Sequence, residues 1–480
     1  MPSRRQVLKM VAAGALAVAP PVVSLRRASA WASRGAGAAE RDGWRDLPAI
    51  LARIRPPTFP ARDFDVTAFG AVGDDHADNT RAFRAAIAAC QAAGGGRVVV
   101  PGGTFMTGAI ELKSGVNLHL AERATTIRFT RDPAAYPVVL TRFEGMECMN
   151  FSPLIYAIEQ DRLAITGTGT LDGNADCEHW WPWKGRTGCG WSAGVPNQDA
   201  DRRALAAMVE RGVPVRDRRF GPGHYLRPQF IEPYRSRNIL IEGVTLRNSP
   251  MWHVHPVLCT NVTVQGLSIV ADGPNTDGCD PESSRDVLIR DCSFDTGDDC
   301  IAIKSGRNAD GRRVSVPSEN IVIQGCRMKN GHGGITIGSE ISAGVRNVFA
   351  EDCRLDSPNL DFAVRVKDNA MRGGLVENLF VRNLDVGQVS RAAVTIDFYY
   401  EEAENGPFTP RVRHVRIEGV KTRQAEYALY LRGFERAPIR EVSIVDCDFN
   451  GVAKDDLVER VVGLVVQNVR INGRRVDRVE

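Results

Sequence analysis

A short unit recurs along most of this sequence, and the repetition limits the fold more than any other feature. Each copy begins with a polar residue, continues with alternating apolar and polar residues, and contains a Gly, Asp or Asn that divides it into two short strands. The period is roughly 25–35 residues, within the range of solenoid proteins. The clearest copies begin at Asn238, Asn261, Asp286, Asn320, Asn347 and Asn378, and fainter ones begin at Asp161, His414 and Glu441.

One unit of this kind cannot bury its apolar side chains alone, so successive copies must stack on one another. Stacking pairs each strand with its equivalent in the next coil, which gives parallel sheets around a continuous apolar interior. The sequence lacks the strand–helix alternation of a doubly wound sheet, and its turn signals are too frequent for helical repeats. We therefore predict an all-β fold, a right-handed parallel β-helix, with a β-propeller as the distant alternative.

Two segments depart from the repeat and predict a cap and an insertion. Residues 83–90 have helical spacing, follow N-cap candidates at 78–80 and end before three glycines at 94–96, so an amphipathic helix there would cover the first coil. Between about residues 177 and 234 the pattern breaks into a long insertion with four tryptophans, basic residues and a predicted helix near 202–211. Insertions into a solenoid lie on one face, which is often the binding face.

The N-terminus predicts an export signal. Residues 3–9 (SRRQVLK) are similar to a twin-arginine signal, and a short apolar stretch and a small-residue cleavage site follow. We expect residues 1–30 to be the signal peptide, 31–60 a linker and 61–480 a single β-helix catalytic domain, in a protein that is periplasmic or secreted. The apolar stretch is too short and interrupted for a comfortable membrane span, so we expect no stable membrane association.

The charge balance argues against nucleic acid as a partner. Residues 1–30 carry five Arg and Lys residues and no acid, so removing these five cations from a chain of formal net charge +3 leaves −2. A nearly neutral protein has no general cationic field for nucleic acid. Any attraction for an anionic ligand must therefore be local.

The eleven cysteines are an odd number, so they cannot all pair within the chain. Four of them occupy one position of the repeat, where other copies have Val or Leu, and we expect them to be small buried residues. These four are Cys292, Cys326, Cys353 and Cys447. Cys177 and Cys189 flank part of the Trp-rich insertion and could form a disulfide in an oxidising compartment.

Four polar clusters occur at similar places in successive repeats. Stacking would bring three carboxylates, an imidazole and two cations onto one patch of surface. Hydrolysis of an acetal bond needs one carboxyl group to protonate the leaving oxygen and another to activate water. Fixed cations beside those groups would bind an acidic sugar. The clusters are Asn275-Thr276-Asp277, Gly297-Asp298-Asp299, Gly331-His332-Gly333 and Arg365-Val366-Lys367.

The spacing within two of these clusters predicts their local geometry. Arg365 and Lys367 are two residues apart, so on a strand they point to the same face. Asp298 and Asp299 are adjacent and cannot both face a cleft from a regular strand, so Gly297 predicts a bend or a bulge.

The ordered set of four clusters resembles the signature of family 28 glycoside hydrolases, the polygalacturonase family. In that family the middle residue of the last cluster is more often isoleucine, and a tyrosine is often found near position 390. Here Tyr399 and Tyr400 lie several residues later. The segments beginning at Phe64 and Ser152 are similar to the bacterial branch, so the resemblance covers roughly Phe64 to the C-terminus.

The resemblance implies hydrolysis of α-1,4 galacturonic acid linkages in pectin or polygalacturonate, with inversion and without a cofactor or metal. The substrate would be a pectic polysaccharide or an oligogalacturonide. Asp298 is the implied general acid, and Asp277 and Asp299 would hold and deprotonate the attacking water. His332 would tune the acid. The implied substrate-binding residues are Arg365, Lys367 and Asn275.

Three other functions are compatible with parts of the pattern. The main alternative is hydrolysis of another uronic-acid pectic polymer such as rhamnogalacturonan. A Ca²⁺-dependent pectate lyase and a non-catalytic β-helix adhesin fit less well, because neither explains three acids, a histidine and an Arg-x-Lys pair in this order. We further expect exo action, because an insertion at residues 177–234 would wall off one end of the cleft.

Overall fold

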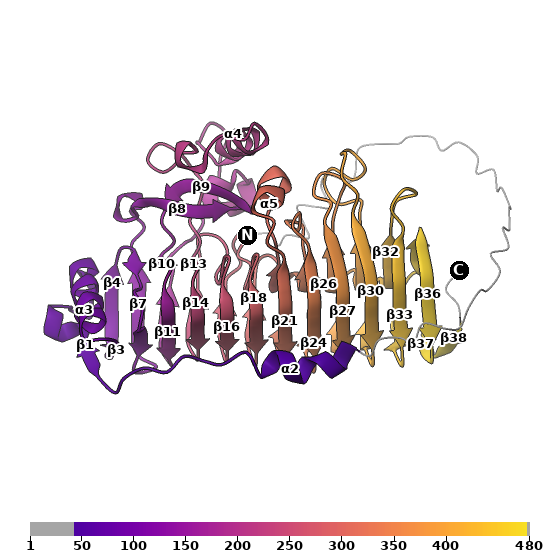
Figure 1. Cartoon of the computed structure of the whole chain (residues 1–480), viewed down its shortest axis with the longest axis horizontal. Helices are drawn as coiled ribbons and strands as arrows, with labels where there is room; N and C mark the ends of the chain where they lie inside the picture. The colour runs from indigo at the N-terminus through magenta and orange to yellow at the C-terminus, as the bar shows by residue number, and fades with distance from the viewer. Residues whose placement is uncertain (1–42, 478–480) are drawn as a thin grey trace. The chain divides into compact units, whose positions relative to one another are not determined.

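The computed structural model describes residues 43–477, so the predicted signal peptide lies outside the described residues. The described residues from Trp44 onward belong to one compact unit. Within this unit the chain winds into stacked coils that contribute strands to two long sheets and to shorter sheets on a third side (Figure 1). The predicted parallel β-helix is confirmed.

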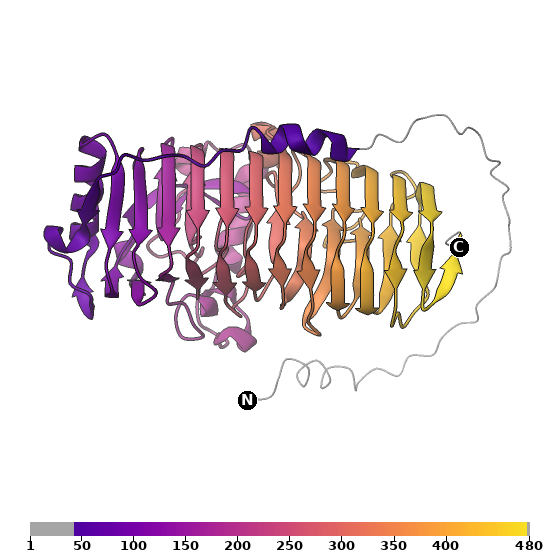
Figure 2. The same ribbon diagram turned by 90° about the horizontal axis from the view of Figure 1, so that it is seen from below.

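All thirteen strands of the first sheet pair in parallel, and in Figure 2 they follow one another along the stack. They are β1 (Asp63–Asp65), β3 (Gly96–Val100), β6 (Val116–Leu120), β11 (Asp161–Gly167), β14 (Arg237–Glu242), β16 (Thr260–Gln265), β18 (Arg285–Arg290), β21 (Ser318–Gln324), β24 (Val345–Glu351), β27 (Leu375–Arg382), β30 (Arg411–Glu418), β33 (Ile439–Val445) and β36 (Val461–Gln467).

The second sheet has fourteen strands, and only its last pair is antiparallel. They are β2 (Asp74–Asp78), β4 (Gly103–Thr107), β7 (Thr125–Phe129), β12 (Thr170–Asp172), β15 (Thr245–Arg247), β17 (Ser268–Val270), β19 (Ser293–Asp295), β22 (Arg327–Met328), β25 (Arg354–Leu355), β28 (Asp385–Gln388), β31 (Lys421–Gln424), β34 (Asp448–Phe449), β37 (Val469–Ile471) and β38 (Arg474–Val476).

The third side consists of two short parallel sheets, linked by isolated bridges at Val254 and Cys279. The first contains β5 (Ile110–Glu111), β10 (Ile155–Ile158) and β13 (Ile231–Tyr234). The second contains β20 (Ile301–Ile303), β23 (Gly331–Ile337), β26 (Leu360–Lys367), β29 (Ala392–Asp397), β32 (Tyr427–Arg432) and β35 (Leu457–Glu459).

The polar residue near the start of each repeat has a backbone role that explains its identity. Asn261, Asn320, Asn347 and their equivalents have φ between about +54° and +61°, a left-handed conformation that Asn and Asp adopt more readily than most residues. Their side chains also bond from coil to coil. Asn347 donates to Asn320 at 3.0 Å, and Asn378 donates to Asn347 at 2.8 Å. The repeat therefore combines a required turn with an amide ladder.

Equivalent apolar side chains stack inside the coils. Each pairs in register with its counterpart in the next strand of the first sheet, and nearly all are fully buried. One such row runs through Ile239, Val262, Val287, Ile321, Val348, Leu379, Val415, Val442 and Leu464. The four cysteines at the shared repeat position are buried as predicted, with at most 2% exposure.

The predicted capping helix is confirmed as α3 (Thr80–Ala92), at the left end of Figure 1. Phe83, Ala86, Ile87 and Cys90 lie on its buried face and join the interior cluster of the first coils. Asp78 accepts a hydrogen bond from the first helical amide at 2.9 Å, and the helix ends before the three glycines. The helix thus covers an interior that would otherwise be open to water.

Part of the predicted linker is packed against the first sheet. The helix α2 (Leu47–Leu51) runs along the outside of the coils in Figure 2. Trp44, beside this helix, lies 5.6 Å from the ring of Phe349, and the Arg382 guanidinium lies 3.9 Å from the centre of the Trp44 ring. Arg53 donates to Asp286 at 3.0 Å. Residues 44–54 therefore form a strap rather than a linker, because their apolar spacing matches outward-facing rings of the sheet.

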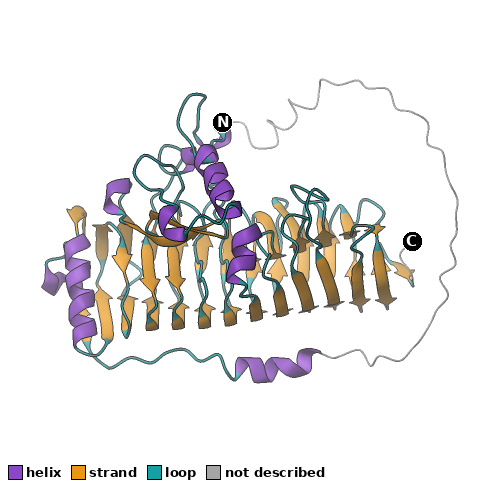
Figure 3. Ribbon diagram, turned by 45° about the horizontal axis from the view of Figure 1, so that its top comes forward, coloured by secondary structure: helices purple, strands orange, loops and turns teal. Residues whose placement is uncertain are grey.

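The insertion packs on a hairpin that the sequence analysis did not predict. This hairpin consists of β8 (Val138–Phe143) and β9 (Met146–Phe151), which pair antiparallel. The predicted helix in the insertion is confirmed as α4 (Asp199–Glu210), and Figure 3 shows it above the coils. Leu205 and Val209 of α4 form a separate small core with Phe143 and Met146. A further short helix, α5 (Asn308–Val314), lies beside α4.

Two smaller expectations concern the cysteines and the membrane. No disulfide joins Cys177 to Cys189 in the part of the chain that the structure describes. Among residues 43–477, no helix has the length and apolar character needed to cross a bilayer.

A buried charge network lies beneath the hairpin. His255 is fully buried and bonds to Glu232 at 3.1 Å and to Glu282 at 2.8 Å. Arg142 of β8 donates to Glu282 at 2.6 Å, so the network also links the hairpin to the coils. Burial alone would lower the pKa of His255, but the two carboxylates outweigh it and raise the pKa from 6.5 to about 9.

This network predicts a pH dependence of stability. A histidine whose pKa is raised by folding contributes stability that is complete below about pH 6.5 and is lost as the pH rises through about 9. We expect the difference in unfolding free energy between the wild type and His255→Gln to be on the order of a few kcal/mol at pH 6. It should shrink toward pH 10 in urea titrations. A difference that stays constant over this range would contradict the network's role.

Candidate active site

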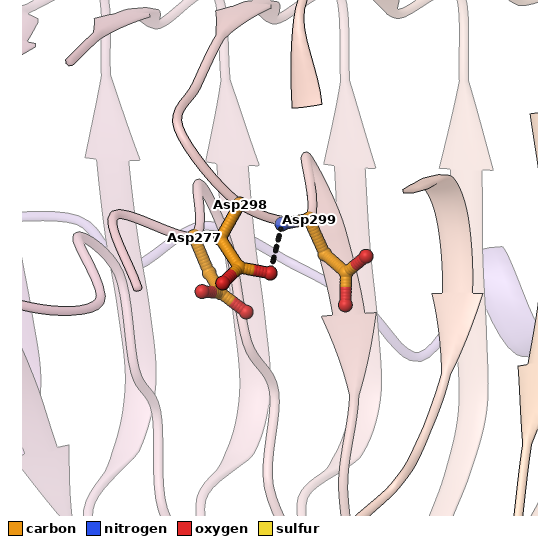
Figure 4. A group of neighbouring side chains, drawn as sticks. All are labelled: Asp277, Asp298 and Asp299. Atoms are coloured by element: carbon orange, nitrogen blue, oxygen red, sulfur yellow. Dashed lines mark hydrogen bonds between the residues drawn. The ribbon is translucent and has the colours of Figure 1, made fainter. Parts of the chain in front are cut away.

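The sequence-predicted site residues meet in one cavity of about 340 Å³ on the third side of the coils. Its lining includes every predicted catalytic or substrate-binding residue except Asp299, which contacts Arg365 and Lys367. The three acids come from the turns that lead into the third side in two successive coils, as Figure 4 shows. Stacking has therefore brought together residues that are up to 92 positions apart, from Asn275 to Lys367.

The chain bends at the two adjacent acids, where the sequence predicted, so that Asp298 lines the cavity and Asp299 contacts the cation pair. Gly297 and Asp298 lie in a bend between β19 and β20, outside any strand. The amide of Asp299 donates to the Asp298 carboxylate at 3.0 Å, which fixes the orientation of both residues. The prediction of a bend at Gly297 is confirmed.

The glycines on either side of His332 are needed for close packing with the previous coil. Gly331 has φ +151°, and a Cβ there would lie 2.5 Å from the carbonyl oxygen of Asp298. A Cβ at Gly333 would lie 2.8 Å from a carboxylate oxygen of Asp299. A side chain at either position would displace an acid, so the Gly-His-Gly pattern places the imidazole directly beside the carboxylates.

The three carboxyl groups are crowded, and each has a different neighbourhood. Each offers an oxygen within 4.8 Å of the others. Asp298 bonds to Nδ1 of His332 at 3.0 Å, and its side chain is 16% exposed. Asp299 accepts from Lys367 at 2.6 Å and is 1% exposed. Asp277 is buried, and no donor among the described residues reaches its Oδ1.

These neighbourhoods determine which carboxyl group keeps a proton in the free protein. Burial, together with the nearby Asp280 and Asp298 carboxylates, raises the pKa of Asp277 well above its ordinary value. Burial would also raise the pKa of Asp298, but the His332 and Lys367 charges outweigh it and lower that pKa. The Asp298 carboxylate in turn raises the pKa of His332. In the free protein Asp277 is therefore the carboxyl group that keeps a proton. Asp298 is ionised and forms an ion pair with the His332 imidazolium.

Behind the three acids lies a buried lysine that sequence reasoning missed. Lys304 is 3% exposed, with its ammonium 3.8 Å from Asp277, 3.5 Å from Asp280 and 3.2 Å from Glu340. It also lies 4.3 Å from the centre of the Trp252 ring. This one cation therefore balances three buried acids. A single lysine at the end of a strand such as β20 gives no recognisable signal in the sequence.

Asp280 completes this group. It is fully buried, and no N–H or hydroxyl donor in the described part of the chain bonds to either of its oxygens. Burial raises the pKa of Asp280 to about 7, even though Lys304 lowers it. Asp277 and Asp280 can hydrogen-bond to each other only when one of them is protonated, so the pair carries a proton near neutral pH.

The predicted cation pair lies on β26 and faces the acids. Val366, between the two cations, points into the apolar interior, so Arg365 and Lys367 share one face as predicted. Arg365 lies 3.4 Å from Asp299. Tyr400 lines the same cavity, 5.3 Å from the Lys367 ammonium and 5.6 Å from the Arg365 guanidinium. Of the two tyrosines that follow position 390, Tyr400 is therefore the one beside the cation pair.

Asn275 is held by a buried arginine from the insertion. Arg227 donates to the Asn275 amide oxygen at 2.8 Å, to the carbonyls of Pro250 and Pro274 through Nη1, and to the Gln198 side chain through Nε. The Asn275 amide then lies 3.4 Å from the Asp298 carboxylate. Burial lowers the pKa of Arg227 to about 10, so its charge is retained near neutral pH.

The insertion and the hairpin form the other wall of the cavity, but not with the tryptophans. Lys184, Arg186 and Arg202 of the insertion line the cavity, together with Glu144 from the turn of the hairpin. None of the four tryptophans of the insertion does. Trp180 and Trp181 belong to the apolar core instead, and the tryptophan that faces the cavity is Trp252.

The acidic cluster has the composition of a metal site, but its surroundings oppose a cation. Asp277, Asp298 and Asp299 could together offer one oxygen each to an ion. Lys367 and Lys304, however, lie within 3.8 Å of two of these carboxylates, and His332 bonds to the third. A divalent cation such as Ca²⁺ would have to displace these charges, which disfavours the lyase alternative.

Comparisons with known proteins agree with this geometry. The sequence model of the family described as glycosyl hydrolases family 28 matches residues 223–463. A second family model, described as rhamnogalacturonase A/epimerase, pectate lyase-like, matches residues 64–131. A Vitis vinifera protein named "Probable polygalacturonase" is 30% identical over 405 residues, which are 80% of this chain and 74% of the relative. The exo-poly-α-D-galacturonosidase of Dickeya chrysanthemi is 28% identical, over 72% of this chain and 59% of the relative.

A solved structure is more similar still. The exopolygalacturonase of Thermotoga maritima has a TM-score of 0.88 and 45% identity, and the match covers 91% of this chain and 97% of the other. The family match and the similarity to an exopolygalacturonase, together with the clustered carboxylates, identify the protein as a glycosidase. This chain belongs to family 28 of the glycosyl hydrolases.

The buried position of Lys304 predicts a large effect on stability. In Lys304→Met, Asp277, Asp280 and Glu340 lose their shared cation, and we expect a loss of roughly 3–5 kcal/mol in unfolding free energy at pH 8. The loss should be smaller at pH 4, where Asp277 and Asp280, whose pKa values are raised, are protonated and no longer need the cation. Urea titrations at both pH values measure it.

Lys329 provides a matched control. It also pairs with an acid, Asp295, but its side chain is 67% exposed, so Lys329→Met should leave the urea midpoint almost unchanged. Equal effects of the two substitutions would show that Lys304 does not balance the buried acids.

Proposed function

We propose that this protein hydrolyses α-1,4 galacturonic acid linkages of polygalacturonate or oligogalacturonides and releases single units from a chain end. One observation carries the proposal. Three carboxyl groups, an imidazolium and the Arg365–Lys367 pair share one cavity, in a chain 45% identical to an exopolygalacturonase. Acids alone would suit many glycosides, whereas the adjacent cations favour a sugar that carries a carboxylate.

Asp298 is the proposed general acid, because it is the most exposed of the three acids and bonds to His332. In the free protein its pKa is low, so it must gain a proton as substrate binds. A uronate that enters the cavity adds negative charge and excludes water, and both changes raise the pKa of a carboxyl group. His332 lies at 3.0 Å and is the nearest source of that proton. The acid is thus formed in the complex rather than before it.

Asp277 and Asp299 are proposed to hold the attacking water. Their oxygens lie within 4.8 Å, so one water molecule can bond to both. Asp298, the proposed acid, also lies within 4.8 Å of both, which is shorter than the roughly 6.5–9.5 Å usual between the acid and the base of inverting glycosidases. Inversion remains the proposal here, because Lys367 holds Asp299 as an ion pair and leaves it poorly placed as a nucleophile.

Exo action is supported by the wall that the insertion and the hairpin build. A chain-internal enzyme needs a cleft that is open at both ends. Here Lys184, Arg202 and Glu144 line the cavity from segments outside the coils, so these segments narrow it. The second family match, to residues 64–131, covers α3 and the first coils rather than the site, so it favours no other pectic substrate.

We also propose export of the protein by the twin-arginine pathway to the periplasm or the outside of the cell. The motif at residues 3–9 supports this proposal, and a polymeric pectic substrate would itself be extracellular. Fractionation of cells that express the full chain, compared with Arg4→Lys/Arg5→Lys, tests it.

The acid assignment predicts the effect of Asp298→Asn. This near-isosteric change should leave the fold intact and lower kcat by roughly 10²–10⁴-fold or more, because a general acid contributes about that factor. Circular dichroism and turnover on polygalacturonate measure the two effects. Near-full activity of a folded variant would remove Asp298 from the role of acid.

The products test the reaction itself. We expect galacturonic acid as the only early product, a slow fall in viscosity, no absorbance from unsaturated product, and full activity in a chelator. NMR in the first minutes should detect the β-anomer if the configuration inverts. Mixed oligomers with a rapid viscosity drop would exclude exo action, and preference for rhamnogalacturonan would support the main alternative.

A further inference from the structure

Ion pairing in the cavity leaves two cations of the insertion unmatched. Glu144 is paired with Arg202 at 2.5 Å and with Arg307 at 2.9 Å, and Glu340 is paired with Lys304. Within residues 43–477, no carboxylate forms an ion pair with Lys184 or Arg186. These two side chains therefore add uncompensated positive charge to one end of the cavity.

The surroundings of Lys184 make this charge costly. Lys184 is half-buried, and burial is the main cause that lowers its pKa. Glu144 attracts it, but Arg186, Arg202 and Arg227 repel it. A half-buried ammonium among three guanidinium groups destabilises the free protein, and a bound anion would relieve that cost.

The position of the two cations relative to the acids follows from the order of the coils. Arg227, which interacts with Lys184, bonds to Asn275 one coil before Asp298. Arg365 and Lys367 lie on β26, two strands after β20 in the third-side sheet. In Figure 1 helix α4 of the insertion lies above the coils that precede β26. Lys184 and Arg186 therefore line the cavity from the insertion, and Arg365 and Lys367 line it from β26, so two separate pairs of cations surround the acids.

We propose that Lys184 and Arg186 form a second carboxylate-binding subsite, which holds the terminal galacturonate that is released. Arg365 and Lys367 then hold the carboxylate of the next unit, so the scissile bond lies between two recognised uronates. This inference rests on the proposed function and deepens it. It also assigns to the insertion a chemical role in addition to closing the cavity.

The first experiment measures kinetics on trigalacturonate for Lys184→Gln, Arg186→Gln and the double variant. We expect the KM of the double variant to rise roughly 10- to 100-fold, as charge-assisted contacts are lost, with a smaller change in kcat. Arg203→Gln is the matched control, because Arg203 is an exposed cation of α4 outside the cavity lining. Its KM should equal that of the wild type.

A second ligand separates the two subsites. 4-Nitrophenyl α-galacturonide carries one carboxylate, which can occupy only the terminal subsite when the aryl group replaces the next sugar. As a substrate or as a competitive inhibitor, it should bind more weakly to Lys184→Gln/Arg186→Gln, with a 10-fold or larger change in KM or Ki. Lys367→Met should change its KM or Ki much less than it changes the KM for trigalacturonate.

Thermal unfolding distinguishes binding from folding. Removing an unpaired, half-buried cation should leave Tm unchanged or raise it, whereas loss of a structural contact would lower it. A wild type that releases galacturonic acid, with an unchanged KM in the double variant, would overturn this inference alone. A wild type inactive on every galacturonide would instead overturn the proposed function.

Discussion

Parallel pairing of equivalent strands in successive coils is the constraint on which the rest of the structure depends. Pairing fixes neighbouring coils about 4.8 Å apart and aligns residues at the same repeat position. Short motifs separated by 20 to 35 residues in sequence are thereby placed side by side through pairing of neighbouring strands alone. The same spacing crowds the carboxyl groups of Asp277 and Asp298. The cavity's unusual protonation is thus a direct result of the stacking.

Most of the coil architecture could be predicted from the sequence, because the repeat carries both its strand pattern and its turn residues. Asn320 and Asn347 mark a turn and a ladder at once, so their recurrence is a strong signal. The site motifs were predictable for a related reason, since stacking converts their order into proximity. The positions of segments outside the repeat cannot be predicted in this way. The hairpin of β8 and β9 and the strap at Trp44 are held by contacts with distant residues, which local patterns do not encode.

The positions of two kinds of side chain at the site could not be predicted from residue type. The insertion was expected to wall off one end of the cleft, but none of its four tryptophans lines the cavity, and Trp180 is buried in the core, where a large ring contributes to packing. Lys304 is a single charged residue at the end of an apolar strand, and only the folded structure shows that four acidic or aromatic neighbours surround it. Predicting a buried charge requires knowledge of its partners, and these come from three different coils.

The strap at residues 44–54 has a consequence for the order in which the chain can fold. The ring of Trp44 packs on Phe349 and Phe380, which lie more than 300 residues further along the chain. Arg53 bonds to Asp286. Coils can form by local zippering from any starting point, but the strap has no docking surface until β24 and β27 exist. A nascent chain therefore holds its N-terminal segment undocked while most of the solenoid is synthesised. Docking of the strap then marks completion of the central coils.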